Sequence, residues 1–234
     1  MMNSHSLDIL VFGAHPDDAE IGMGATIYKH TKAGRQVGMC DLTHAEMSSN
    51  GTVETRIQEA NLASTILGLA TRTNLGLPDR GLFMNAETIQ LITLEIRKHR
   101  PRIVFAPYWI DRHPDHVMCS KLVDEAIFNA KLRNYLPDVA PVRVEKLYYY
   151  YINDLDEPQL IVDVSEEYDI KMRALQAYKT QFESASAELN SVPTPINQGF
   201  LERIEAQGKI LGQKVSCTYA EGFASKSPVQ IDLF

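Results

Sequence analysis

Two short segments of the chain carry residues that can perform hydrolytic chemistry: residues 14–18, Ala-His-Pro-Asp-Asp, and residues 113–116, His-Pro-Asp-His. Each places histidine and carboxylate side chains within a few positions of one another. Imidazole nitrogens and carboxylate oxygens suit a catalytic zinc, which takes three protein ligands and keeps a fourth position for water. In the first segment alone, an aspartate could simply cap a helix. The two segments together favour a metal site.

One ligand set is visible in these segments: His15, Asp18 and His116. His15 and Asp18 lie on a segment that should turn from a strand into a helix, so their side chains can converge. His116 must arrive from the end of a different strand. Asp17 and His113 then lie beside the metal, where hydrolysis needs a base and a group that stabilises an oxyanion.

The elements that must position these residues follow a regular alternation. Strand-like runs cover residues 7–12, 37–42 and 103–106, with a short piece at 73–75. Amphipathic helical patterns cover residues 20–33, 53–67 and 86–99. This rhythm is typical of βαβ units, in which catalytic groups collect beyond the carboxyl ends of the strands. The sequence therefore predicts an α/β fold with a Rossmann-like, mainly parallel sheet flanked by helices and an active site at the strand carboxyl ends.

The rest of the chain continues this pattern up to one long interruption. We expect a helix over residues 117–132, strands over 146–152 and 160–164, and a helix over 166–182. The tyrosine run 148–151 is expected to pack in the core rather than on a substrate, since alternate strand residues face opposite sides. Residues 183–199 lack periodicity and predict a long loop, for which a lid and simple disorder both stay open. We expect one domain over residues 1–234.

The composition narrows the class of protein. A chain of 234 residues with 44% apolar residues can bury a sizeable core, and a net charge of −7 argues against a general nucleic-acid or anionic-membrane surface. The three cysteines form no CxxC pair and suggest neither a disulfide framework nor a thiolate zinc site. The first residues show neither a basic segment nor a long apolar run, so no signal peptide or membrane span is expected. These features favour a cytoplasmic protein.

The glycines after the first segment do not form a nucleotide fingerprint. Gly22 and Gly24 lie inside the expected helix, whereas a dinucleotide-binding fingerprint needs its glycines in the turn before the helix. That turn holds His15 and two aspartates, whose negative charge would repel a pyrophosphate. A dinucleotide-binding protein is therefore disfavoured, and we expect these glycines to allow close helix packing.

With these residues in view, the chain resembles the LmbE-like family of zinc-dependent N-deacetylases, also called the PIG-L family, over nearly its whole length. The resemblance rests on the Ala-His-Pro-Asp-Asp and His-Pro-Asp-His segments. It is closest to the branch that deacetylates N-acetylglucosaminyl-malate in bacillithiol biosynthesis. Further matches to that branch lie at residues 41–43, 48–52, 77–81, 105–108, 111–113 and 219–223.

This resemblance implies a hydrolase that uses Zn²⁺ to remove the acetyl group from an N-acetylglucosamine conjugate. It implies that the zinc ligands are His15, Asp18 and His116. Asp17 would then be the base that takes a proton from the attacking water. His113, oriented by Asp115, would stabilise the oxyanion of the tetrahedral intermediate. Which of Asp17 and His113 protonates the departing amine stays open.

The resemblance also implies a set of substrate contacts. Arg56 and Asp79 match positions that hydrogen-bond glucosamine hydroxyls in relatives. Arg80 and Arg112 are expected to meet the malate carboxylates or the scissile region, because a guanidinium can grip a carboxylate with two hydrogen bonds. For Arg80 a surface or subunit contact is equally open. Where the branch often has a tyrosine that reaches the active site, this chain has Phe200, which cannot donate that hydrogen bond.

The expected partner is therefore a small amino-sugar conjugate, with no nucleic acid and no membrane. By analogy with relatives in this branch, we expect a homo-oligomer such as a hexamer. Two other readings stay open. One is a zinc amidase or deacetylase that acts on another amide, such as a chitooligosaccharide or a thiol conjugate. The other is a non-catalytic metal-binding module, against which the presence of both Asp17 and His113 argues.

Overall fold

The computed structural model describes residues 6–185 and 191–229. Its strands are β1 (Ile9–Gly13), β2 (Val37–Thr43), β3 (Thr71–Leu77), β4 (Ile103–Pro107), β5 (Lys146–Tyr150), β6 (Leu160–Asp163) and β7 (Ala220–Ala224). Its helices are α1 (Asp18–Lys32), α2 (Val53–Leu67), α3 (Ala86–His99), α4 (Pro114–Ala130), α5 (Tyr168–Gln176), α6 (Lys179–Phe182) and α7 (Phe200–Lys214).

Within the described residues, the strands form one seven-stranded sheet in the order β3-β2-β1-β4-β5-β7-β6. The first five strands of this order pair in parallel, and β7 runs antiparallel to both of its neighbours. The predicted mainly parallel α/β sheet is confirmed. Because β1 pairs with β2 on one side and β4 on the other, the chain order reverses at β1. Ligands of open α/β sheets bind at such a switch point.

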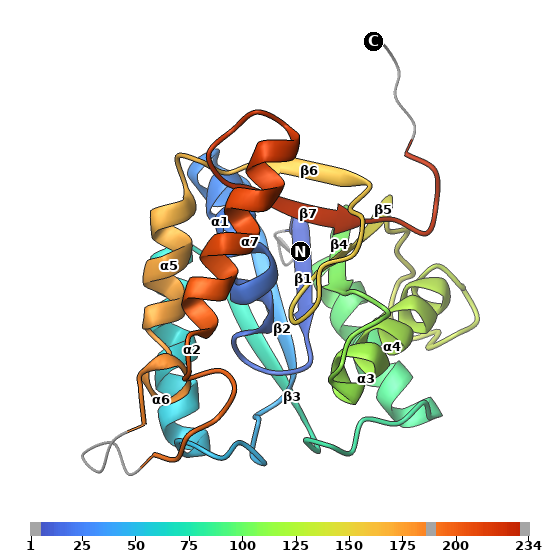
Figure 1. The fold of residues 1–234 in the computed structure, drawn as a ribbon. Coiled ribbons are helices and arrows are strands. Elements are labelled where there is room, and N and C mark those ends of the chain that lie inside the picture. Colours follow the sequence, from blue (N-terminus) through green and yellow to red (C-terminus); the bar gives the residue numbers. More distant parts are fainter. Residues whose placement is uncertain (1–5, 186–190, 230–234) are drawn as a thin grey trace.

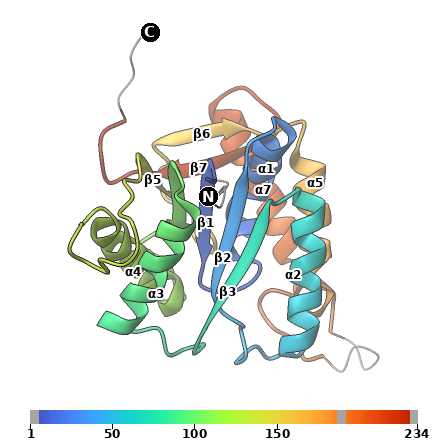
Figure 2. The same cartoon turned by 180° about the vertical axis from the view of Figure 1, so that it is seen from behind.

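Helices cover both faces of the sheet (Figure 1). Helices α1, α2, α5 and α7 pack on one face and α3 and α4 on the other, as the reverse view also shows (Figure 2). Every residue of β1 and β2 is buried, which explains why β1 is a continuous apolar run and β2 is mostly apolar. The edge strand β3 is only partly buried, and it is longer than the predicted 73–75.

The C-terminal third departs from the prediction. The helix expected over residues 166–182 is two helices, because Tyr178 adopts φ −86° and ψ 63° between α5 and α6. Helix α7 and strand β7, which the sequence patterns did not predict, complete the sheet and cover one face. Of the loop expected over 183–199, residues 186–190 lie outside the described part. Its described end is anchored by Asn50, whose side chain hydrogen-bonds the N–H and C=O of Val192 at 2.7 and 2.9 Å.

Two smaller predictions are confirmed. A Cβ atom on Gly22 would lie 2.2 Å from Cδ2 of Tyr150, so this glycine does permit close packing of α1 on β5. The tyrosines of β5 pack in the core, with Tyr149 and Tyr150 almost fully buried.

No helix within the described ranges is long and apolar enough to cross a bilayer.

Candidate active site

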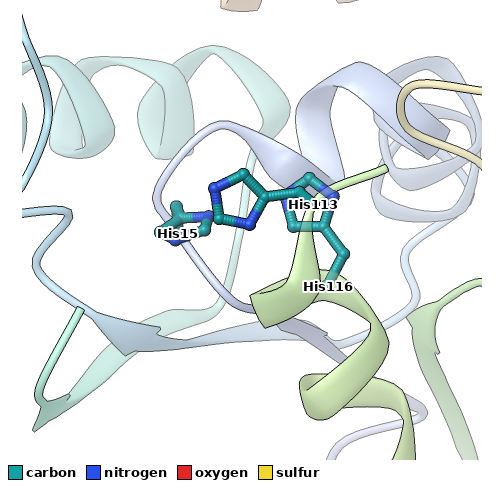
Figure 3. A group of neighbouring side chains, drawn as sticks. All are labelled: His15, His113 and His116. Carbon is teal, nitrogen blue, oxygen red and sulfur yellow. The ribbon is translucent and has the colours of Figure 1, made fainter. Parts of the chain in front are cut away.

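The two histidine segments meet at the carboxyl end of the sheet. Residues 14–18 follow β1, and residues 113–116 begin α4, which follows the neighbouring parallel strand β4. Figure 3 shows His15 beside His113 and His116, the last two at the start of α4. The ring centroids of His15 and His116 are 5.5 Å apart. The topology thus joins segments that are far apart in the chain.

Asp18 lies between the rings of His15 and His116. Its Oδ1 is 3.1 Å from Nε2 of His116, and its Oδ2 is 3.6 Å from Nδ1 of His15. Oδ2 also accepts a hydrogen bond from the backbone N–H of His15 at 2.9 Å, which fixes the carboxylate. All three residues are buried. Both histidines of the predicted ligand set therefore face the carboxylate of its third member, Asp18.

The second ring nitrogen of each of these histidines faces another carboxylate. Nε2 of His15 is 3.1 Å from Oδ1 of Asp79, and Nδ1 of His116 is 3.0 Å from Oδ1 of Asp111. Because a carboxylate only accepts, these nitrogens carry protons, so in a neutral ring the nitrogen that faces Asp18 is the one left to bind a cation. Metal-binding histidines have this arrangement. Burial lowers the pKa of His116, but Asp18 and Asp111 outweigh it and raise that pKa to about 9, so the position favours a positive charge.

His113 lies beside the ligand set but is oriented differently. It is the N-cap residue of α4, and its Nδ1 accepts a hydrogen bond from the backbone N–H of Asp115 at 3.2 Å. Its ring stacks on that of His116 with 4.7 Å between centroids. Burial, His116 and His15 lower the pKa of His113 to about 4. The ring is therefore neutral, with its proton on Nε2, and it offers a donor instead of a ligand lone pair.

Asp17 is held by a buried arginine. Nη1 of Arg56 donates to Oδ2 of Asp17 at 2.9 Å and to the carbonyl oxygen of Pro16 at 2.7 Å, and Nη2 donates to Oγ of Ser48 at 3.1 Å. Asp17 is the N-cap residue of α1, yet its side chain makes no capping hydrogen bond, so the helix-capping reading fails for it. Its φ of 117° is a conformation that costs a non-glycine residue about 1–3 kcal/mol. Burial raises the pKa of Asp17 to about 7, against the opposing effect of Arg56.

Comparison with known proteins identifies the family to which this chain belongs. The sequence profile of the PIG-L family, described as GlcNAc-PI de-N-acetylase, matches residues 10–127, half of the chain. This chain belongs to the PIG-L family of deacetylases. The family prediction is therefore confirmed.

Three PIG-L-like proteins show how far the likeness extends. The conserved protein TT1542 from Thermus thermophilus is 38% identical, and its structure superimposes with a TM-score of 0.88 over 96% of this chain and 97% of that one. Diacetylchitobiose deacetylase from Thermococcus kodakarensis is 31% identical over 74% of this chain and 70% of its own. A Bacillus subtilis protein described as a probable N-acetyl-alpha-D-glucosaminyl L-malate deacetylase 2 is 29% identical over 77% of this chain and 86% of its own. Two of these relatives are named for different sugar substrates.

In this PIG-L protein, several of the expected substrate contacts are already engaged by protein groups. Both oxygens of Asp79 have partners, because Oδ1 faces His15 and Oδ2 accepts the backbone N–H of Met47 at 3.0 Å. Arg56 directs its hydrogen bonds to the loop that carries Asp17 and to Ser48. We therefore interpret Asp79 and Arg56 as residues that orient His15 and Asp17, a role that differs from the expected contacts to sugar hydroxyls.

The carboxylate of Asp115 also has a different partner from the expected one. Its Oδ1 accepts from Nη1 of Arg80 at 2.9 Å and its Oδ2 from the backbone N–H of Arg80 at 2.8 Å. Asp115 does orient His113, but through its main-chain N–H. Arg80 is consequently an ion-pair partner at the rim, and its side chain is 47% exposed.

A pocket of about 200 Å³ opens beside the ligand set. Arg112 lines it, is exposed, and makes no hydrogen bond or ion pair with any residue in the described ranges. The pocket wall also has an apolar part, which includes the side chains of Ile152, Ile196 and Phe200. Phe200 stacks on Phe182 at 6.0 Å, so the residue that replaces the expected tyrosine forms part of an apolar wall.

Two residues of this site had no role in the sequence interpretation. Asp111 binds His116, and Asn153, which follows β5, holds Asp111 through its side-chain N–H at 2.9 Å and its backbone N–H at 3.2 Å. Asp111 lies in segment 111–113, one of the segments that match the family. That match is the sequence signal from which a role for Asp111 could have been inferred. Nothing in the residues around Asn153 indicates its partner, because the contact depends on how two loops meet.

Two groups of side chains offer possible ligand atoms within 4.8 Å of one another: His15 with His113 and His116, and His15 with Asp79 and Asp115. The second group surrounds Nε2 of His15. Nε2 of His15 lies 3.1 Å from Asp79 and 3.6 Å from Asp115. If Nδ1 of His15 faces a cation at Asp18, the neutral ring must carry its proton on Nε2. Both oxygens of Asp115 are already hydrogen-bonded to Arg80. We therefore interpret this group as the support of His15.

Proposed function

We propose that this protein is a zinc-dependent deacetylase that converts N-acetylglucosaminyl-malate to glucosaminyl-malate and acetate in bacillithiol biosynthesis. One observation carries the proposal. Nδ1 of His15 and Nε2 of His116 face the carboxylate of Asp18, beside a pocket that Asp17 and His113 also line. Family membership supports the reaction class, and the malate-linked substrate is supported by the Bacillus subtilis relative.

The residues present fit a zinc ion. Two imidazole nitrogens and one carboxylate are a donor set that catalytic zinc prefers, and each histidine has a carboxylate behind it. His15, Asp18 and His116 would hold the ion. When bound, zinc supplies Lewis-acid polarisation of the acetyl carbonyl and a lowered pKa of water.

Asp17 is placed to act as the general base. Arg56 holds Oδ2, which leaves Oδ1 to take a proton from the water that attacks the acetyl carbon. The positive φ of Asp17 fixes the carboxylate beside Asp18 without using it as a helix cap. Arg56 therefore keeps the base in place.

His113 is placed to stabilise the charge that develops on the acetyl oxygen. Because its Nδ1 accepts from the main chain, its Nε2–H is the group that can donate. A single oxyanion contact of this kind contributes about 3 kcal/mol to the transition state. The C–N bond then breaks, and the amine takes the proton that Asp17 received from the attacking water, because the neutral His113 ring has no acidic proton to give.

Arg112 is the residue best placed to bind the malate carboxylates. Of the arginines expected to meet malate, Arg80 pairs with Asp115, whereas Arg112 lines the pocket without a protein partner in the described part of the chain. One charge-assisted contact is worth about 1.5–3 kcal/mol, or one to two orders of magnitude in specificity, provided that it is shielded from water.

Kinetics on a substrate series tests this proposal. Zinc-loaded protein would be incubated with N-acetylglucosaminyl-malate, methyl N-acetylglucosaminide and diacetylchitobiose while free amine and acetate are measured. We expect kcat/KM to be at least about tenfold higher for the malate conjugate, and Arg112→Ala to remove this preference. Arg133→Ala, which changes an exposed arginine outside the pocket, is the matched control. Equal values for the malate conjugate and the methyl glycoside would exclude recognition of an anionic aglycone.

A deacetylase that prefers a chitooligosaccharide is the second candidate. The Thermococcus kodakarensis relative favours it, and the apolar side of the pocket could pack against a second sugar ring. A higher kcat/KM for diacetylchitobiose in the same series would select this candidate.

The metal assignment has its own test. His116→Ala should lose most bound zinc together with activity, as measured by metal analysis after gel filtration. Tight stoichiometric zinc in this variant would rule out the ligand set.

We also propose a cytoplasmic homo-oligomer, with a hexamer as the starting hypothesis. Light scattering on the purified protein measures the assembly, and fractionation of producing cells measures the location.

A further inference from the structure

Helix α7 begins at the wall of the pocket, and its first turn touches both that wall and the loop after β5. Phe200, the first residue of α7, lines the pocket. The guanidinium of Arg203 lies over the Phe200 ring, 4.8 Å from its centroid. Nη2 of Arg203 also donates to the carbonyl oxygen of Asn153 at 2.6 Å. One arginine therefore contacts a pocket residue and a residue of another loop.

Asn153 continues this chain of contacts to a predicted zinc ligand. Its side-chain N–H donates to Oδ1 of Asp111, and its backbone N–H donates to Oδ2. Oδ1 of Asp111 also accepts the backbone N–H of His113 at 2.7 Å and faces Nδ1 of His116. These donors fix Asp111 in the position from which it orients His116. Asn153 and Asp111 are both almost fully buried, so no bulk water can replace these bonds.

We propose that Arg203 and Asn153 are positioning residues that link the Phe200 wall of the pocket to the orientation of His116. A sugar that packs against Phe200 orders the guanidinium stacked on that ring, and the guanidinium holds the carbonyl of Asn153. Occupancy of the pocket and affinity for the metal are then coupled, and the coupling must act equally in both directions. This inference rests on the proposed metal-dependent function, and it adds a route by which substrate binding completes the metal site.

Zinc titrations on the purified protein test the link. The zinc dissociation constant would be measured by competition with a chromophoric chelator, with and without saturating glucosamine, and unfolding temperatures would verify that each variant is folded. Asn153→Ala should weaken zinc binding by about tenfold, the lower end for groups that support a metal ligand, because it acts through Asp111 and its backbone N–H remains. Arg203→Ala should weaken it by about fivefold or more, at the lower end of typical couplings.

Two further variants separate a specific link from a general structural effect. Glu202→Ala changes an exposed residue of the same helical turn and should leave zinc affinity unchanged. Arg203→Lys keeps a donor for the Asn153 carbonyl but loses the planar group that stacks on Phe200, so zinc affinity should recover while the effect of glucosamine does not. In the wild type, glucosamine should tighten zinc binding, and in Arg203→Ala this effect should disappear.

The outcomes are distinguishable from those that test the proposed function. Wild-type zinc affinity and an undiminished glucosamine effect in a folded Arg203→Ala variant would overturn the link, even if the enzyme is an active deacetylase. An absence of deacetylase activity in the wild type would defeat the proposed function, yet the zinc titrations would still report on Arg203 and Asn153.

Discussion

Two of the buried ion pairs beside helix α1 differ in what the carboxylate is free to do. At the start of the helix, Arg56 binds Asp17 at 2.9 Å. Near the middle of the helix, Lys171 binds Glu221 of β7 at 2.7 Å. All four side chains are nearly inaccessible to water. Burial of a charge pair alone therefore does not distinguish a catalytic carboxylate from a structural one.

The Glu221 carboxylate is fully used by the fold. Met23 interrupts α1 with φ −150°, and just beyond it the backbone N–H groups of Ala25 and Thr26 point to Glu221. Oε1 accepts from Lys171 and from Ala25 at 3.2 Å, and Oε2 accepts from Thr26 at 2.7 Å. Glu221 therefore caps the second part of α1, and Lys171 neutralises it.

Asp17 differs in three respects. Only its Oδ2 is held by Arg56, its backbone has a positive φ, and it lines the pocket. Strained backbone that persists in a well-packed surrounding is typical of functional positions. The comparison indicates that a carboxylate with one engaged oxygen and an open side is available for proton transfer, whereas one with both oxygens engaged is not.

The largest effect should follow from breaking the structural pair. Lys171→Met leaves the charge of Glu221 buried without a cationic partner, and we expect the free energy of unfolding to fall by about 3–5 kcal/mol. The kcat of the folded enzyme should change little, because Lys171 does not line the catalytic pocket. Urea unfolding and initial rates measure the two quantities. A loss of stability below about 1 kcal/mol would contradict the role assigned to this pair.

The catalytic pair should respond in the opposite way. Asp17→Asn preserves the shape of the side chain but removes the base, so kcat should fall by roughly a hundredfold or more while zinc stays bound. Steady-state kinetics and metal analysis on the same preparation measure this. A near-normal kcat would show that a group other than Asp17 takes the proton from water.

A smaller effect is expected at the carboxylate behind His15. Asp79→Asn retains a hydrogen-bond acceptor but removes the charge, so zinc affinity should fall by about tenfold, the lower end for groups that support metal ligands. Chelator competition measures the change, and KM for substrate should remain near the wild-type value once zinc is saturating. If KM rises instead and zinc affinity does not change, Asp79 binds the sugar as the family resemblance implied.

The parallel part of the fold could be predicted because its strands lie between two helical layers. β1, β2 and most of β4 are buried, so most of their residues are apolar. Asp41 in β2 is an exception, and its carboxylate pairs with Arg72. The sequence of β7, by contrast, does not indicate a buried strand. Its sequence, Ala-Glu-Gly-Phe-Ala, is entirely buried but contains no β-branched residue, and its Glu221 is buried only because Lys171 and α1 surround it. Helix α7 did offer a periodic pattern, since Phe200, Ile204, Gly208 and Leu211 are among its buried positions.

The site was predictable where chemistry depends on residue type, and not where it depends on loop contacts. Histidine and aspartate at 15, 18 and 116 indicate a metal, and β1 and β4 do bring them together. The partners of Asp79 and Arg56 could not be predicted, since a carboxylate or guanidinium in a loop can face substrate or protein equally well. Three-dimensional packing decides that choice.

A third ion pair, nearer the surface and outside α1, gives the smallest effect and adds a dependence on pH. At the end of α3, Glu95 lies 2.8 Å from Nε2 of His99, 2.7 Å from Oγ1 of Thr73, and 3.4 Å from the exposed Lys98. Burial raises the pKa of Glu95, but the hydrogen bonds with His99 and Thr73 outweigh it and hold the pKa at about 2, below the ordinary 4.5. The folded state therefore binds this proton less readily than the unfolded state.

The stabilisation from this pair should be complete above pH 4.5 and should be lost as the pH falls toward 2, since protonation then becomes favourable in both states. We expect Glu95→Gln to lower the free energy of unfolding by less than Lys171→Met at neutral pH. The difference between wild type and Glu95→Gln should stay constant from pH 7 to 5 and shrink below pH 4.5, which urea unfolding at a series of pH values measures. A difference that does not change with pH would show that Glu95 contributes through packing or neutral hydrogen bonds and not through its charge.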